Sequence, residues 1–169
     1  VLFSGGATLV VLLLLGVAIF TAVENSLAST NIASMNQRAR ALASYLSRPG
    51  DRPPPVNQFL GQDSGIFAYI VDPTDDSVVA GATLRDPVEG IPDSAGVDAA
   101  VGGGTDLRNS TLRASVETSS GETTTVEIPV RVLSQLVQTD NGNRVVQVVQ
   151  DRSAEVDTLN SLLRVLLGG

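Results

Sequence analysis

The chain contains no cysteine, no histidine, no tryptophan and no lysine, and only 4% of its 169 residues are aromatic. Without cysteine, the fold has neither disulfides nor thiolate metal sites. Without histidine, the chain lacks the commonest general base, the commonest metal ligand and any phosphohistidine. Because aromatic side chains are so few, the core must be built mainly from Val, Leu, Ile and Ala.

The net charge is −7, the eleven basic residues are all arginine, and residues 1–23 carry no charge. An acidic chain with dispersed arginines lacks the basic face that binds phosphates, so we expect no nucleic-acid partner. No paired carboxylates, Ser/Asp set or glycine-rich phosphate loop stands in a context that supports chemistry. We therefore predict no catalytic residue, no cofactor-binding residue and no metal ligand in this chain.

Residues 1–23 form one apolar run, centred on "LVVLLLLGVAIF" and ended abruptly by Glu24 and Asn25. A helix of roughly 20 apolar residues crosses the ~30 Å hydrocarbon core of a bilayer. We therefore predict a transmembrane helix over residues 1–23, which makes the lipid bilayer a partner of the chain. A cleaved signal peptide is the alternative, because Ser26 and Ala28 supply the small residues of a cleavage site.

The helix is expected to continue over residues 24–48 as a juxtamembrane helix, until Pro49 and Gly50 end it. Apolar residues recur along it at alternating gaps of four and three, which is the spacing of a coiled-coil seam. This seam consists of Ala28, Ile32, Met35, Ala39, Leu42 and Leu46. We favour a parallel homodimer through it, since a membrane helix would align two copies. Packing of the seam on the chain's own domain is the alternative.

Residues 49–152 are expected to form an α+β domain with an antiparallel sheet of about five strands. Residues 66–71 and 77–82 are predicted to pair as a hairpin around "DPTDD". The three aspartates of this turn fit a solvated turn better than a calcium loop, because the EF-hand spacing and its distal Glu are absent. The first hairpin is therefore predicted without a metal.

Residues 83–96 hold two prolines and two glycines and are expected to form a loop, followed by a short helix in "VDAAVGGG". Three strands follow at hairpin spacing: "STLRASVET", "TTTVEIPVRVLSQLVQT" and "RVVQVVQ". Asn141-Gly142, between the last two, is a strong hairpin signal, and Pro129 indicates an edge or a bulge. Any ligand pocket is expected near the polar positions between Arg85 and Arg113.

Residues 153–169 are predicted to form a C-terminal helix that leads into a second, truncated membrane span. Asp151 or Ser153 supplies the cap, and no polar side chain follows Arg164. This helix carries a second apolar stripe, whose members are Val156, Leu159, Leu163 and Leu166. The alternative is a natural C-terminal helix that packs on the sheet.

Two stretches make the chain resemble the N-terminal transmembrane and extracytoplasmic sensor region of a bacterial two-component sensor histidine kinase. One is the leucine-rich run leading into "ENSLASTNIASMNQRARALASYL", and the other is "VEIPVRVLSQLVQTDNGNRVVQVVQDRSAEVDTLNSLLRVLL". The resemblance implies a PAS-like sheet between two spans, with residues 24–160 outside the inner (cytoplasmic) membrane. It makes residues 24–48 a signalling helix, residues 49–152 an extracytoplasmic sensor domain and the two apolar stripes a helix-transmission seam. It also implies an unknown extracytoplasmic stimulus. ATP and a response regulator are implied only for a cytoplasmic kinase part beyond this chain.

The catalytic residues of that family do not carry over, since the phosphoaccepting histidine has no counterpart in a chain without histidine. The resemblance therefore implies a non-enzymatic sensor portion of an ATP-dependent protein-histidine kinase, which transmits a stimulus through paired helices. A chemotaxis receptor or a cyclic-dinucleotide synthase with the same sensory half is one alternative. A single-pass membrane-anchored or secreted structural or binding protein is another.

Overall fold

The computed structural model describes residues 3–48, 50, 54–55, 59–60, 65–82, 88–117 and 121–168. Most side chains before Ser29 and all side chains after Ser161 lie outside the described part. The chain divides into two compact units, one made of Val1–Ile32 with Ala154–Gly169 and the other of Ala33–Ser153. The second unit contains the sheet, and we refer to it as the sheet unit.

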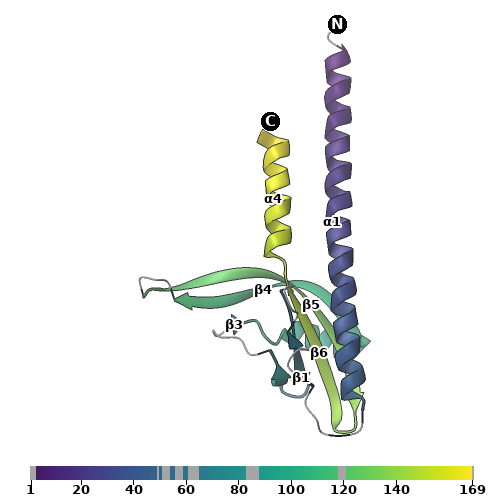
Figure 1. The fold of residues 1–169 in the computed structure, drawn as a ribbon, viewed down its shortest axis with the longest axis vertical. Helices are drawn as coiled ribbons and strands as arrows, with labels where there is room; N and C mark the ends of the chain where they lie inside the picture. The colour runs from purple at the N-terminus through teal and green to yellow at the C-terminus, as the bar shows by residue number, and fades with distance from the viewer. Residues whose placement is uncertain are drawn as a thin grey trace. The chain divides into compact units, whose positions relative to one another are not determined.

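The described residues contain three helices and one six-stranded sheet, which confirms the α+β class predicted from the sequence. The elements are, in chain order, α1 (Phe3–Leu46), β1 (Ile66–Asp72), β2 (Ser77–Gly81), β3 (Val88–Glu89), α3 (Ser94–Gly103), β4 (Thr105–Glu117), β5 (Thr123–Thr139), β6 (Gly142–Asp151) and α4 (Ser153–Gly168). The strands are antiparallel and lie in the order β2-β1-β6-β5-β4-β3 (Figure 1). The predicted count of about five strands missed β3. This strand has two residues and lies where a loop was expected.

Helix α1 runs without interruption from Phe3 to Leu46, so the predicted continuation of the first helix beyond Glu24 is confirmed. Among the described residues, no helix combines the length and the apolar composition needed to cross a membrane. The two predicted spans, residues 1–23 and the end of residues 153–169, gain no support from this finding. They fall largely on side chains outside the described part.

The β5–β6 hairpin follows the sequence pattern closely. Its turn reaches β6 at Gly142, whose φ of +107° suits glycine, and the Thr139 hydroxyl donates to the Gly142 carbonyl at 2.7 Å. Pairing between β5 and β6 begins at Val130 and Asp151, so Pro129 lies just beyond the end of this ladder. The amide hydrogen that proline lacks is therefore not needed by this ladder. The predicted edge or bulge is not found, because β5 lies between β6 and β4 and Pro129 pairs with Thr111 of β4.

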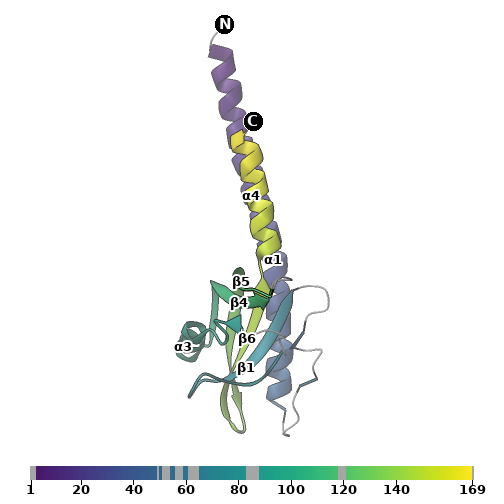
Figure 2. The ribbon, with the colours of Figure 1, turned by 90° about the vertical axis from the view of Figure 1, so that its left-hand side faces the viewer.

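Both faces of the central strands are covered within the sheet unit. The C-terminal part of α1 lies on one face of the sheet and α3 lies on the other (Figure 2). Six consecutive residues of β6, from Val145 to Gln150, are consequently buried. A strand covered on both sides needs a nearly continuous apolar run, and "VVQVVQ" supplies one with two glutamines in it.

Candidate functional site

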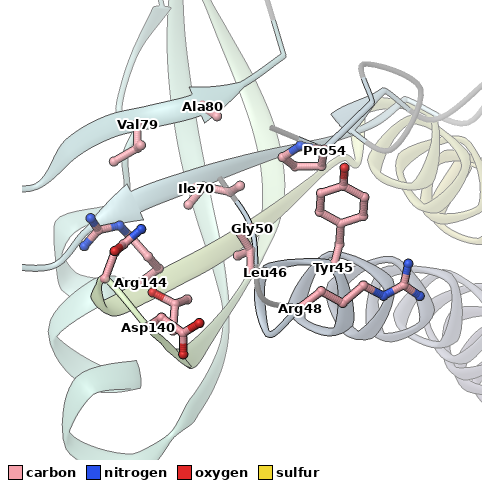
Figure 3. Close-up of a pocket in the computed structure, with 12 residues that line it drawn as sticks. Tyr45, Leu46, Arg48, Gly50, Pro54, Ile70, Val79, Ala80, Asp140 and Arg144 are labelled. Carbon is pink, nitrogen blue, oxygen red and sulfur yellow. The ribbon is translucent and has the colours of Figure 1, made fainter. Parts of the chain in front are cut away.

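A pocket of about 360 Å³ lies at the end of α1, beside the β1–β2 hairpin and the β5–β6 turn (Figure 3). We call it the α1-end pocket. Its apolar lining comprises Leu46, Pro54, Ile70, Val79 and Ala80. Its polar lining comprises Tyr45, Arg48, Thr139, Asp140, Asn141 and Arg144. An apolar interior with a few polar groups, and a volume near the low end of ~300–1,000 Å³, are typical of small-molecule sites.

One wall of the α1-end pocket contains an ion pair. Arg144 Nη1 lies 2.9 Å from Asp72 Oδ2 and also donates to the Asn143 carbonyl at 2.8 Å. The Thr74 N–H donates to Asp72 Oδ1 at 3.0 Å. The hydrogen bonds from Thr74, followed by the charge of Arg144, lower the pKa of the Asp72 carboxyl. Asp72 therefore stays ionised at neutral pH, and its pair with Arg144 adds no net charge to the wall.

The aspartates between β1 and β2 close the turn, as the sequence analysis predicted. Asp72 accepts from the Thr74 N–H as described above, and Asp75 Oδ1 accepts from the Ser77 N–H at 3.0 Å. Asp76 adopts a positive φ of 58°, a conformation that aspartate tolerates better than most residues. These side chains thus satisfy the backbone of a tight turn next to the pocket.

The other side of the α1-end pocket is the last turn of α1. Tyr45 projects from it and Arg48 from the turn that follows, and the Arg48 guanidinium carbon lies 6.0 Å from the centroid of the Tyr45 ring. The Arg48 N–H donates to the Tyr45 carbonyl at 3.2 Å, so the backbone of this turn is ordered by the helix itself. Tyr45 therefore stands on a helix whose preceding turns are fixed in the core of the sheet unit, and Arg48 follows two residues after the end of that helix.

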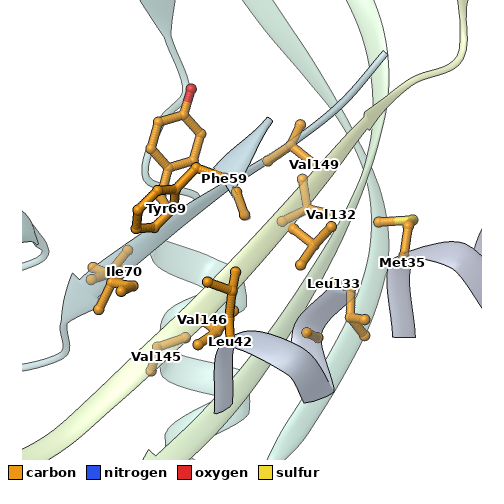
Figure 4. Packing of buried hydrophobic residues seen from close by; sticks show 14 of the residues in the cluster. Met35, Leu42, Phe59, Tyr69, Ile70, Val132, Leu133, Val145, Val146 and Val149 are labelled. Carbon is orange, nitrogen blue, oxygen red and sulfur yellow. The ribbon is translucent and has the colours of Figure 1, made fainter. Parts of the chain in front are cut away.

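The stripe predicted as a transmission seam packs on the sheet of the same chain. Met35, Ala39 and Leu42 are each 0% exposed and belong to the hydrophobic core of the sheet unit. Figure 4 shows Met35 and Leu42 among the packed residues of this core, which also contains Leu133 and Val146. These three residues are therefore not available to a second copy of the chain. The parallel-dimer seam is wrong for them, and the alternative, packing on the chain's own domain, is correct. A homodimer through other surfaces remains a prediction.

The remaining residues of the predicted seam are less enclosed. Leu46 packs against the edge of the same core, and Ile32 is half-buried. On α4, Val156 and Leu159 are also half-buried. Three further members of the seam have side chains outside the described residues: Ala28, Leu163 and Leu166. The structure therefore brings Met35, Ala39, Leu42 and Leu46 together at the core of the sheet unit. The role of the other seam residues stays a prediction.

The exit from the sheet into α4 is short and hydrogen-bonded. Only Arg152 separates β6 from α4, and its N–H donates to the Pro129 carbonyl at 2.8 Å. The Asp151 N–H donates to the Gly65 carbonyl at 3.0 Å, and Asp151 Oδ1 accepts from the Ser153 N–H at 2.7 Å. Asp151, one of the two residues predicted to cap this helix, thus accepts from the first N–H of α4.

A buried glutamine joins α3 to the centre of the sheet. Gln147 is 1% exposed; its Oε1 accepts from the Asp93 N–H at 3.0 Å, and its Nε2 donates to the Asp93 carbonyl at 2.9 Å. Nε2 also lies 3.0 Å from the Ser134 hydroxyl oxygen. A Cβ on Gly96 would stand only 2.7 Å from that hydroxyl, so glycine permits the close approach of α3. Gln147 therefore fixes the start of α3 on β6.

The pocket expected between Arg85 and Arg113 is not the one described above, because the α1-end pocket draws its lining from other segments. Sequence analysis also missed Gln147, although a glutamine inside "VVQVVQ" signals a buried polar contact. The lining of the α1-end pocket gives no comparable signal, because its residues are scattered from Tyr45 to Arg144.

Comparison of the sequence with protein-family models gives no match, and comparison with curated proteins gives none either.

Proposed function

We propose that this chain is the extracytoplasmic signal-sensing portion of a membrane-bound sensor histidine kinase. In this proposal residues 1–23 and the end of α4 are membrane spans, and the sheet unit lies outside the inner membrane. A cytoplasmic kinase core, which uses ATP and a response regulator, belongs to the same protein. The chain itself carries no catalytic residue and shifts the kinase between two states.

The observation that carries the proposal is the connection of one sheet to both terminal helices. α1 contributes Met35, Ala39 and Leu42 to the core of the sheet unit. β6 lies between β1 and β5 at the centre of the sheet and passes into α4 through Arg152. A displacement of the sheet therefore acts on both helices, which is the coupling that a transmembrane sensor requires.

The strand order also supports a PAS-like sensor. The β1–β2 hairpin lies beside the last strand, β6, and the connection from β2 to β4 contains α3. If the two-residue β3 is set aside, the order is the first hairpin, then β6, β5 and β4. This layout resembles a PAS-like sheet, the type suggested by the sequence.

Signal transfer in this proposal needs two arrangements of the helices and the sheet that differ by a few kcal/mol, with the stimulus favouring one. A ligand changes that balance only by binding the two arrangements with different affinity. Paired helices from a parallel homodimer are part of the proposal. Their contacts lie outside Met35, Ala39 and Leu42, which the sheet covers.

Reporter fusions test the location that the proposal requires. Alkaline phosphatase needs disulfides and is active only outside the cytoplasm. Fused after Asp98, an exposed residue of α3, it is expected to be active, whereas β-galactosidase fused at the same position is expected to be inactive. The opposite pattern would place the sheet unit in the cytoplasm and refute the sensor topology.

The reading frame beyond Gly169 tests the output. An apolar segment followed by a helix with a phosphoaccepting histidine is expected. A chemotaxis or cyclic-dinucleotide output domain would keep the sensor and replace the kinase. A stop codon shortly after Gly169 would favour an anchored or secreted binding protein instead.

A further inference from the structure

We infer that the α1-end pocket binds a small zwitterion with an aliphatic body, such as an aliphatic amino acid or a short ω-amino acid. The apolar wall would take the body, and two opposite charges on different elements would take the two ends.

The α1-end pocket has room for a ligand, and its apolar wall includes a side chain that is exposed to water. Ile70 lies at 2% exposure on this wall, while Val79, on the edge strand β2, is 55% exposed. An aliphatic body of four or so carbons would remove part of this Val79 surface from water, at ~25 cal/mol per Å² of apolar area. The pocket volume of about 360 Å³ limits the ligand to a small molecule.

The charges at the pocket select the polar ends of the ligand. Arg144 is already paired with Asp72. Among the described residues, neither Arg48, on the turn that follows α1, nor Asp140, on the β5–β6 turn, has an ion-pair partner. Within the described part of the chain, the pocket thus presents one cation, which lies over the Tyr45 ring, and one anion, neither of them in an ion pair. A ligand with both a carboxylate and an ammonium group complements both charges, whereas an anion or a cation complements only one.

Arg48 and Asp140 are both exposed, so their side chains are able to reorient toward a ligand within nanoseconds. The apolar wall behind them belongs to the packed core through Ile70 and Leu46 and is fixed beforehand. The site therefore combines a rigid apolar wall with two adjustable charges, which suits ligands whose charges are adjacent or separated by a short chain.

Such a ligand would join the end of α1 to the β1–β2 and β5–β6 hairpins. Its role as the stimulus rests on the function proposed above, whereas binding is measured without any signalling readout. Failure of binding therefore overturns the ligand assignment and leaves the sensor proposal in place. Failure of the topology test does the reverse.

Four probes separate the charges of the ligand from its apolar body. Leucine and 6-aminohexanoate are zwitterions, 4-methylpentanoate lacks the ammonium group, and 3-methylbutylamine lacks the carboxylate. Binding to the full chain in detergent is measured by saturation-transfer NMR. Tyrosine emission of a Tyr69→Phe variant, in which Tyr45 is the sole tyrosine, locates binding at the pocket. At least one zwitterion is expected to bind about tenfold more tightly than both single-charge analogues, the gain of one charged hydrogen bond.

Charge variants test each end separately. Arg48→Gln is expected to remove the roughly tenfold preference of the pocket for the zwitterion over the amine. Asp140→Asn is expected to remove the roughly tenfold preference of the pocket for the zwitterion over the carboxylate. Arg113→Gln and Asp98→Asn remove exposed charges away from the pocket and are expected to leave affinity within about twofold.

Three results would overturn the inference. They are no binding by any of the four probes, equal binding of a zwitterion and a single-charge analogue, and equal effects of the pocket and control variants. Because all four substituted side chains are exposed, loss of binding with an unchanged unfolding temperature cannot come from misfolding.

Discussion

Replacing Leu42 by alanine tests whether α1 is part of the sheet core. Leu42 is 0% exposed, and the substitution removes three carbon atoms from its contact with the sheet. At ~0.8 kcal/mol per buried methylene, the lost transfer energy is about 2.4 kcal/mol. A residual cavity of ~50 Å³ would add about 1.2 kcal/mol at ~24 cal/mol per Å³. Alanine is a better helix former than leucine, so the expected destabilisation of about 3–4 kcal/mol comes from packing alone.

The assay is urea unfolding of the full chain in detergent, followed by tyrosine emission. With a slope of ~1.5–2 kcal/mol per M for a domain of this size, the midpoint should fall by about 2 M. Arg40→Ala, an exposed position on the same helix, is the matched control and should change stability by less than ~0.5 kcal/mol.

Equal, small effects of Leu42→Ala and Arg40→Ala would refute the packing of α1 on the sheet. A large effect of Leu42→Ala whose size depends on protein concentration would also refute it. That result would move Leu42 into an interface between two copies, because only association makes stability concentration-dependent.

Three further predictions concern the face of the sheet that α3 covers and the stability of the fold at high pH. Gly96→Ala should destabilise the fold by about 1–3 kcal/mol in the same assay, because its Cβ would lie 2.7 Å from the Ser134 hydroxyl oxygen. The control is Gly102→Ala on the same helix, which has open space around it and should be neutral or stabilising. Gln147→Leu should cost about 1–3 kcal/mol, because it removes the acceptor of the Asp93 N–H and the donor to the buried Ser134 hydroxyl, whereas the Asp93 carbonyl keeps the Val97 N–H. An unchanged urea midpoint would contradict the anchoring of α3. Burial raises the pKa of Tyr69 from 10.0 to about 12, so its contribution to stability is complete below pH 10 and is lost as the pH rises to about 12. Tyr69→Phe should weaken this alkaline loss of stability, and an identical loss in both proteins would show that Tyr69 is not its source.

Local patterns predicted much of the sheet. The alternation in "TTTVEIPVRVLSQLVQT" and the Asn141-Gly142 turn gave β5 and the β5–β6 hairpin, because both signals lie in neighbouring residues. β3 was not predictable in this way. Its two residues form a strand only because they pair with Arg113 and Ala114, which belong to a distant part of the sequence.

The partner of the α1 stripe was not predictable for a different reason. The alternating gaps of Met35, Ala39 and Leu42 define one face of a helix, but a flat apolar sheet and a second helix both pack on such a face. The α1-end pocket was harder still, since Tyr45, Val79 and Arg144 have no common spacing and meet only after the sheet has formed.

The buried stripe limits how a stimulus could move α1 in the proposed sensor. A shift of α1 by one helical turn, 5.4 Å, would take Met35 and Leu42 out of their places in the core. Exposing two such side chains costs about 3–6 kcal/mol, whereas coupling to a ligand usually supplies about 1–3 kcal/mol. The C-terminal part of α1 and the sheet should therefore move as one body, by the 1–2 Å that packed elements tolerate. Larger motions then fall at Ile32 and at Ser153, where the chain divides into its two compact units.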